Sequence, residues 1–598
     1  MFVDEPWGET VVRNLLKPIV AEISSALDPE TLWSMEILRM HRQAKSLLQL
    51  EVLLLRDIEL FNQGTLDLRL ARLYLELGET QILLGKRREG VHQILVSLDE
   101  IDRVDRAIGG GSDSRALHEA QVHYLYRWAV LGLLNAGDAF EALETIDRGR
   151  GRELARHQRA SSVMLPPAVL ELDSKIDYLT SQLESSASDD DQRRIRAEIR
   201  DLRSAQRLLG PSAPKRSESI IPLKLTFPEI RASLDPGTLL LYYVVGSHET
   251  YIFAIRRGGQ PSLSIFHFPI ESYVLASRAK AFLNGIEESR EPKESEANRL
   301  YDLLVLPVQS LIESSDRIAI SAEGPLLSIP FSALRHDGRY LAEVKPIHRI
   351  ASVATFKRLK EQRPQKTDSK RWKVVAFADP RYSEAGGSQD GIRDPALTRA
   401  VERGLSLAPL PASRVEVESL AESFSSIRAF LGADASESNA REYSASADVL
   451  HFACHGLLDS ASPYDSALAL ATPQRAIPGR DNGLLQAWEV GERLSLKAEL
   501  VTLSACKTAL GDAGSGEGLL GMSWAFQAAG ARSVVASTWS VSDRETAELM
   551  KRFYRHLSEG LPKDEAFRSA QAEMIHSGDS ALAAPAAWAG FELFGDWR

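Results

Sequence analysis

The sequence contains 598 residues, of which 44% are hydrophobic and 26% are charged, an ordinary composition for a globular protein. At about 100–200 residues per domain, this length suggests about three domains. The formal net charge is -11, so neither the overall charge nor a basic stripe points to nucleic acid as a partner. With only 2 cysteines, the chain has no disulfide scaffold, and a reducing compartment is expected.

The N-terminal segment MFVDEPWGETVVRNLL carries charges throughout and lacks the apolar core of a signal peptide. No stretch of the sequence reaches the ~18 apolar residues that a membrane-spanning helix needs. We therefore expect a soluble cytoplasmic protein, with no membrane partner and no direct contact with nucleic acid.

Residues 1–165 are predicted to form a helical region. Leu70, Leu73 and Leu77 belong to a stripe with helical spacing, and Gly78 is predicted to end that helix. Small residues such as AGDA separate the later helical patterns. The region resembles degenerate tetratricopeptide repeats, with a plain helical bundle as the alternative.

Residues 166–222 are predicted to contain an antiparallel helical hairpin and a linker. Leu172, Ile176 and Leu179 recur at helical spacing, and SSASDDDQ forms a polar turn before the second helix. The following segment, GPSAPKRSESIIP, has no periodicity and is typical of a linker.

From residue 223 onward, short strands replace the helical pattern. TLLLYYVV, TYIFAI, LSIFHF and RIAIS predict a partly antiparallel sheet. The later strands KVVAFA, IRAFL, DVLHFA, ELVTLS, RSVVAS and FELFG alternate with helical patterns at 412–425, 517–529, 543–557 and 563–576. Continuous apolar strands separated by helices predict an α/β domain whose mostly parallel sheet is covered by helices.

Two of these strands lead into reactive side chains. DVLHFA continues into Cys454, His455 and Gly456, and ELVTLS continues toward Cys506. Catalytic groups collect beyond the carboxyl ends of parallel strands, so His455 and Cys506 are predicted to form a catalytic dyad. An imidazole promotes ionisation of a nearby thiol and then protonates the leaving amine. The backbone N–H groups of Gly456 and Cys506 would stabilise the developing oxyanion.

These motifs resemble those of a known family. HFACHG at 451–456 and SACKTALG at 504–511 resemble the histidine and cysteine motifs of the CHAT domain, a caspase-like peptidase domain often attached to tetratricopeptide repeats. LSIPFSAL, LPASRVEVESLA, GEGLLGMSWAFQAAGARSVVASTWSVSD and WAGFELFGDW resemble its flanking blocks. The resemblance extends from residue 225 to residue 598. Cys454 departs from the pattern, because the family usually has a small polar residue there.

The resemblance implies a two-part domain, with an inactive caspase-like half at 223–360 and an active half at 361–598. It also implies cleavage of protein substrates without a cofactor, control by a partner or attached sensor, and relatives in bacteria. We expect the helical region 1–165 to bind that protein activator or sensor. A catalytically silent caspase-like scaffold or signalling adaptor is the alternative, and a thiol-based redox sensor is a third hypothesis.

The remaining cysteine and histidine favour structural roles. Alternation along the strand places Cys454 on the opposite face from His455, so Cys454 is predicted to fill the core. A zinc site made of His451, Cys454, His455 and Cys506 is disfavoured, because the spacing matches no common site. We therefore expect no metal.

Three residues are candidates for a substrate pocket. Asp543 and Trp539 lie in STWSVSD, which follows a sheet strand and should line the cleft, and Asp459 follows the histidine motif. An aspartate there would select a basic substrate residue. The alternative for both aspartates is a surface or capping role, and for Trp539 a position in the core.

Overall fold

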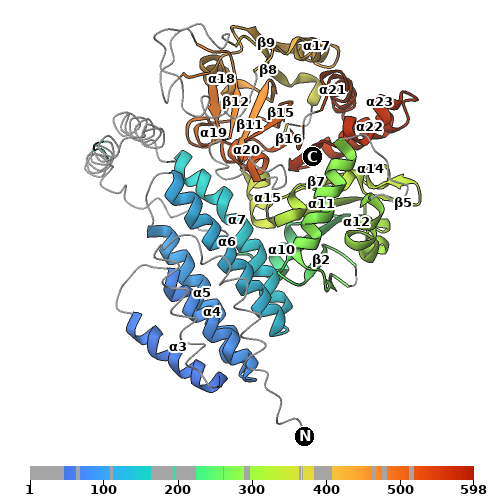
Figure 1. The fold of residues 1–598 in the computed structure, drawn as a ribbon. Coiled ribbons are helices and arrows are strands. Elements are labelled where there is room, and N and C mark those ends of the chain that lie inside the picture. Colours follow the sequence, from blue (N-terminus) through green and yellow to red (C-terminus); the bar gives the residue numbers. More distant parts are fainter. Residues whose placement is uncertain are drawn as a thin grey trace. The chain divides into compact units, whose positions relative to one another are not determined.

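A computed structural model describes most of the chain in two compact units, Met1–Gly149 and Arg150–Arg598 (Figure 1). The described residues are 46–61, 68–107, 112–162, 194, 202, 224–259, 261–287, 296–362, 365–366, 368–382, 407–459, 466–473, 481–510, 517–539 and 541–598. The predicted hairpin and linker at 166–222 lie outside them, except for Arg194 and Leu202.

The first unit is helical, as the apolar periodicity predicted. Its described helices are α3 (Leu47–Phe61), α4 (Leu68–Leu83), α5 (Arg87–Ala107), α6 (Ser112–Asn135) and the beginning of α7 (Ala139–Ser162). The prediction that Gly78 ends its helix was wrong, because α4 continues to Leu83. A Cβ atom on Gly78 would lie 2.8 Å from the carbonyl oxygen of Gly90, so this glycine instead allows α4 and α5 to pack closely.

The second unit is built on a large sheet that contains eleven strands among the described residues. Their spatial order is β3 (Leu263–Phe268), β2 (Thr250–Arg256), β1 (Thr238–Val245), β4 (Arg317–Ser321), β7 (Ile347–Arg349), β17 (Phe591–Gly595), β16 (Ser533–Ser537), β14 (Leu500–Leu503), β10 (Val449–Ala453), β8 (Lys373–Pro380) and β9 (Ser426–Gly432). β16, β14, β10, β8 and β9 run parallel, whereas β3, β2 and β1 are antiparallel neighbours and β17 is antiparallel to β16. This confirms the predicted mostly parallel sheet.

Helices cover both faces of the sheet. α17 (Pro411–Ser419), α21 (Asp543–Ser558) and α22 (Lys563–Ile575) share a core with Val374 and Val449. α18 (Glu437–Tyr443), α19 (Ala487–Arg493) and α20 (Glu517–Ala528) share another with Val375 and Leu450. Successive side chains in a strand point to opposite faces, so the continuously apolar strands supply both cores.

The second unit contains further helices among its described residues. They are α10 (Phe227–Ser233), α11 (Ser272–Glu287), α12 (Glu296–Leu304), α13 (Gln309–Glu313), α14 (Leu341–Val344), α15 (Val353–Glu361), α23 (Ser580–Ala583) and α24 (Pro585–Trp588). A two-stranded ribbon joins β5 (Arg335–His336) to β6 (Arg339–Tyr340). The core and the large sheet both continue across residue 360, so a boundary between two halves at that point stays a prediction.

A second, smaller sheet follows the large one, and the sequence did not predict it. Its order is β13 (Leu484–Gln486), β12 (Ala467–Ala469), β11 (His455–Asp459) and β15 (Cys506–Leu510). The sequence predicted that the strands ended before His455 and Cys506. Instead, the chain resumes an extended conformation beyond β10 and β14, and both residues begin new strands.

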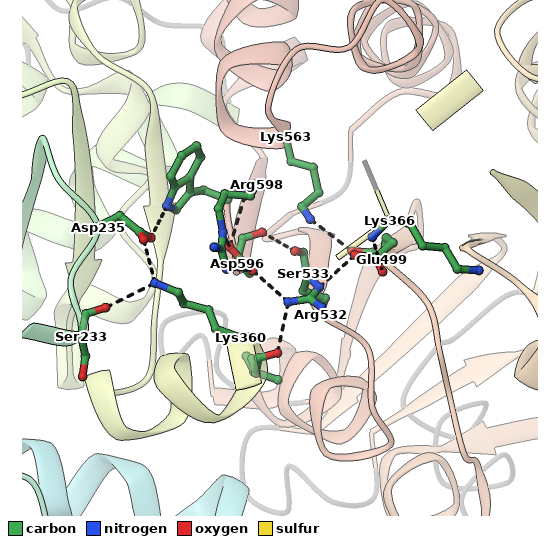
Figure 2. Close-up of polar contacts among 12 residues, drawn as sticks. Ser233, Asp235, Lys360, Lys366, Glu499, Arg532, Ser533, Lys563, Asp596 and Arg598 are labelled. Atoms are coloured by element: carbon green, nitrogen blue, oxygen red, sulfur yellow. Dashed lines mark hydrogen bonds and ion pairs between the residues drawn. The ribbon is translucent and has the colours of Figure 1, made fainter. Parts of the chain in front are cut away.

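An ionic network is buried at the edge of the large sheet where β10, β14 and β16 begin (Figure 2). Arg532, which is 1% exposed, donates to the Glu499 carboxylate at 2.9 Å and to the Asp596 carboxylate at 3.1 Å. Lys563 donates to the Glu499 carbonyl oxygen. Burial alone would raise the pKa of Asp596, but Arg598 and Lys563 lower it to about 2.

Candidate active site

The backbone places His455 and Cys506 directly opposite each other. They are register partners at the beginning of the parallel strands β11 and β15, and Gly456 is likewise opposite Lys507. This arrangement arises because the preceding strands, β10 and β14, are parallel neighbours in the large sheet. The side chain of Cys506 lies outside the described residues, and so does that of Asp459 at the end of β11.

The imidazole of His455 is oriented by one hydrogen bond. Its Nε2 lies 2.8 Å from the carbonyl oxygen of Ala408, and its ring centroid lies 5.5 Å from that of Tyr382. A carbonyl oxygen only accepts, so Nε2 must carry the hydrogen. The buried Nδ1 has no hydrogen-bond partner among the described residues. His455 therefore retains a nitrogen with which it can accept a proton.

Cys454 lies beside His455 in sequence but belongs to the core. It is 1% exposed and packs in the same apolar cluster as Leu468 and Ala505. This confirms the predicted core position, which depended on alternation along the strand.

A small pocket lies where β10, β14 and β16 end, and its polar lining is mostly acidic and hydroxylic. Two carboxylates reach it, those of Glu416 in α17 and Asp543 at the beginning of α21. The lining residues are Leu410, Ser413, Glu416, Ala453, Cys454, Ser504, Ala505, Ser537, Asp543, Thr546 and Phe591. Burial raises the pKa of Asp543, the negative charge of Glu416 raises it further, and His455 opposes both effects.

The residues predicted to line a substrate pocket therefore occupy different positions. Asp543 lines the pocket, and the charge of His455 lowers its pKa against the effect of burial, but its role in binding substrate stays a prediction. Trp539 is 3% exposed, and its indole N–H donates to the Ala586 carbonyl oxygen at 3.2 Å. It is not among the residues that line the pocket. Of the two roles considered for Trp539, this burial favours the core.

Glu416 was missed by the sequence analysis. It lies in the block LPASRVEVESLA, where an acidic residue in a short helix is typical of a solvated surface. The available signal was its spacing: Ser413 and Glu416 are three residues apart and share a helix face with Val417, which is buried.

Three comparisons place the chain among known proteins. The model of the CHAT domain matches residues 294–596. Tetratricopeptide repeat protein 28 of Mus musculus is 25% identical over 334 residues, which is 50% of this chain and 13% of that protein. The same protein of Homo sapiens is 25% identical over 333 residues, with the same shares. The chain thus spans 13% of the length of these relatives.

Solved structures are also similar to parts of this chain. The Arg-specific cysteine proteinase gingipain R aligns with 50% of this chain and 68% of its own, at 11% identity and a TM-score of 0.30. The separase–securin complex of Saccharomyces cerevisiae aligns with 98% of this chain and 48% of its own, at 9% identity and a TM-score of 0.36. Among the described residues, no helix is long and apolar enough to cross a membrane.

Proposed function

Because this chain belongs to the CHAT domain family, we propose that it is a cysteine endopeptidase in which His455 and Cys506 form the catalytic dyad. One observation carries the proposal: the register of β11 and β15 pairs these two residues, and His455 keeps an unpartnered nitrogen beside the strand of Cys506.

The proposed reaction is acyl transfer to the thiol. His455 accepts the proton of Cys506 at Nδ1, and the thiolate attacks the carbonyl carbon of the scissile peptide bond. The backbone N–H groups of Gly456 and Cys506 stabilise the oxyanion. The imidazolium then protonates the leaving amine, and water hydrolyses the acyl-enzyme with His455 again acting as base. The Ala408 carbonyl holds the ring during both steps.

Asp543 supports a preference for a basic substrate residue before the scissile bond. Asp543 is partly buried, is the first residue of α21 and lines the pocket at the ends of β10, β14 and β16. A cationic side chain would neutralise it, whereas an apolar side chain would desolvate the carboxylate without a partner. We propose that Asp543 binds the basic substrate side chain, and Asp459 remains a second candidate for that role.

The dyad is tested with a thiol-directed peptidyl acyloxymethyl ketone on the full chain. We expect rapid labelling of Cys506, no labelling of Cys506→Ala, and a rate lowered about 10²–10⁴-fold in His455→Ala, since that is the contribution of a positioned general base. Cys454→Ser is the control for labelling of the other cysteine, and it should still be labelled at Cys506. Equal rates in the wild type and His455→Ala would contradict the dyad.

The same variants separate a peptidase from a silent scaffold. New protein N-termini should appear in cells that express the wild type and not in cells that express Cys506→Ala. Rapid labelling without any new N-termini would favour the scaffold or signalling adaptor.

We further propose that a protein activator binds the N-terminal helical region and controls the peptidase. Helix α7 runs through the boundary after Gly149, so the last part of this helix belongs to the second unit. There Arg150 donates to the carbonyl oxygen of Ser321 at 2.9 Å and pairs with Glu323 at 3.1 Å. An activator that changes the position of α7 would act on the ends of β1 and β4 through these contacts.

Control is tested by measuring the labelling rate of the full chain and of a chain that lacks 1–149, each with and without cell extract. We expect the extract to accelerate only the full chain. Equal rates under all four conditions would remove the proposed control.

A further inference from the structure

A tyrosine hydroxyl from outside the small sheet lies at the beginning of the strand that His455 starts. Tyr382 donates this hydroxyl to the Ala469 carbonyl oxygen at 3.0 Å, and the backbone nitrogen of His455 donates to the hydroxyl oxygen at 3.5 Å. Burial raises the pKa of Tyr382 far above its ordinary value, so the hydroxyl keeps the hydrogen that it donates. His455 and Ala469 are register partners in β11 and β12, so one side chain contacts both members of the pair that contains the proposed base.

The ring of Tyr382 also lies beside the imidazole. The two ring centroids are 5.5 Å apart, with an interplanar angle of 40°. Tyr382 and Leu407 both pack against the apolar cluster of the small sheet, and the residue after Leu407 is Ala408, whose carbonyl oxygen accepts from Nε2 of His455. Tyr382 therefore contacts His455 at its backbone nitrogen and at its ring, while Ala408 fixes the ring at Nε2.

A β-bulge directs the chain toward this position. The register between β8 and β9 shifts at Asp379, which is an extra residue in β8. Its φ of 48° lies in the left-handed region, which residues other than glycine, asparagine and aspartate rarely adopt. Bulges bend a strand and re-aim the side chains that follow, and they are common beside active sites. The side chain re-aimed here is that of Tyr382, three residues beyond the bulge.

Hydrogen bonds fix the bulge on both sides. Asp379 donates its backbone N–H to the hydroxyl of Ser413 in α17 at 2.8 Å. Arg381 donates its backbone N–H to the last residue of β9 at 3.0 Å and accepts from the backbone N–H of Thr472, just after β12, at 3.1 Å. An unusual backbone conformation persists only where its surroundings fix it in this way. Tyr382 is thus attached to the large sheet and to the small sheet at once.

We propose that Tyr382 is a positioning residue for the dyad, presented to the small sheet by the bulge at Asp379, and that it keeps the imidazole of His455 within reach of Cys506. The inference rests on the proposed peptidase and deepens it. His455 and Cys506 begin the parallel strands β11 and β15, so a shift at the first residue of β11 changes the distance over which the proton is transferred. A displacement of about 1 Å at a reacting group costs up to about 10²-fold in rate.

The first experiment measures the hydroxyl contact without catalysis. Amide hydrogen exchange of the full chain is followed by mass spectrometry in fragments that resolve His455. Tyr382→Phe keeps the ring and removes the hydroxyl, so the His455 amide should exchange about tenfold faster, the factor that one hydrogen bond contributes. Tyr273→Phe, at an exposed position in α11, is the matched control and should leave this exchange unchanged. Unchanged exchange at His455 in Tyr382→Phe would overturn the proposal.

The second experiment labels Cys506 with the peptidyl acyloxymethyl ketone at increasing concentrations, which separates reagent binding from the labelling step. Tyr382→Phe should lower the maximum labelling rate about tenfold and leave the half-saturating concentration unchanged, because it displaces the base and not the bound reagent. The pH of half-maximal rate should also move higher, since a displaced imidazole promotes less ionisation of the thiol. An unchanged maximum rate with a smaller labelled fraction would mean that Tyr382 is only structural.

The bulge is tested with two aspartates of the same backbone conformation. Asp337, in the turn between β5 and β6, also has a φ of 48°. Alanine is less favourable than aspartate in this region, so Asp379→Ala and Asp337→Ala should both lose stability. Only Asp379→Ala should lower the maximum labelling rate of the folded chain. Equal maximum rates in these two variants would show that the bulge does not position Tyr382.

The experiments distinguish the failure of each proposal. Faster exchange at His455 in Tyr382→Phe, without labelling of Cys506 in any chain, would support the hydroxyl contact and remove the peptidase. Equal labelling and equal exchange in the wild type and in Tyr382→Phe would support the peptidase and overturn the role of Tyr382.

Discussion

The large sheet has a first edge at which its parallel strands begin and a second edge at which they end. The buried polar groups at these two edges differ in their hydrogen bonding. Where β10, β14 and β16 begin, Arg532 joins the carboxylates of Glu499 and Asp596 in a buried ionic network (Figure 2). Where the same strands end, His455 Nδ1 and Thr546 Oγ1 are buried without partners among the described residues. Buried polar groups are normally hydrogen-bonded, so the unpartnered groups at the ends of these strands retain an unfavourable free energy that the ionic network at their beginnings does not have.

This difference separates stability from function within one sheet. The charges at the first edge attach the segment after β17 to the beginning of β16, because Arg532 contacts Asp596 and Ser533 Oγ donates to the Asp596 carbonyl. At the second edge, the same kinds of group remain available to a ligand. We therefore expect substitutions at the first edge to change the free energy of unfolding, and substitutions at the second to change binding and catalysis.

The largest expected effect is at the first edge. Arg532→Met should lower the free energy of unfolding by about 3–5 kcal/mol, because it leaves two buried carboxylates without their shared cation. Urea unfolding of the full chain measures this loss. Arg544→Met is the matched control: its ion pair with Asp579 is exposed, with 68% of the arginine side chain accessible, and should contribute about 0–1 kcal/mol. Equal losses in the free energy of unfolding in both variants would show that the buried network at the first edge stabilises the fold no more than an exposed ion pair.

Much of this organisation is readable from the sequence. The apolar runs predicted every strand of the large sheet except the short β7. DVLHFA and ELVTLS also predicted that the chain would be adjacent at His455 and Cys506, which are register partners, whereas their action as a dyad stays a prediction. These predictions succeeded because they depend on local patterns: continuous burial for strand formation, and the common edge at which parallel strands end.

Other features depend on contacts that the sequence pattern does not encode. Glu416 faces His451 only because α17 packs against β10, and in sequence it resembles a surface residue. The strand that begins at His455 is short and is stabilised by pairing with β12 and β15 rather than by its own composition. Gly78 was misassigned because a helix-ending glycine and a close-packing glycine are identical in sequence.

The pH dependence of the free energy of unfolding should show the burial of Lys563 at the first edge, with a somewhat smaller effect than Arg532→Met. Burial is the main cause that lowers the pKa of Lys563 from 10.5 to about 8. Between these two values the unfolded chain binds a proton that the folded chain has released, so the free energy of unfolding rises with pH. At about 1.4 kcal/mol per pKa unit, the gain is about 3 kcal/mol.

The variant Lys563→Met measures how much of this pH-dependent gain in the free energy of unfolding comes from Lys563. Urea unfolding gives the free energy of unfolding of both chains at about pH 8 and at about pH 10.5. The wild-type value minus the variant value should be about 3 kcal/mol larger at the higher pH. Taking the difference cancels the titration of other groups common to both chains. A difference that is constant or decreases with pH would show that the ammonium is not disfavoured by its burial beside Glu499.

The smallest expected effect compares two threonines of similar burial. Thr502 Oγ1 lies 2.6 Å from the Tyr554 hydroxyl, whereas Thr546 Oγ1 has no partner among the described residues. Thr502→Val should therefore lower the free energy of unfolding by about 1–2 kcal/mol, and Thr546→Val should leave it unchanged or raise it by up to about 1 kcal/mol. Urea unfolding of the full chain measures both changes. A loss of stability in Thr546→Val equal to that in Thr502→Val would show that the Thr546 hydroxyl already has a hydrogen-bond partner in the folded chain.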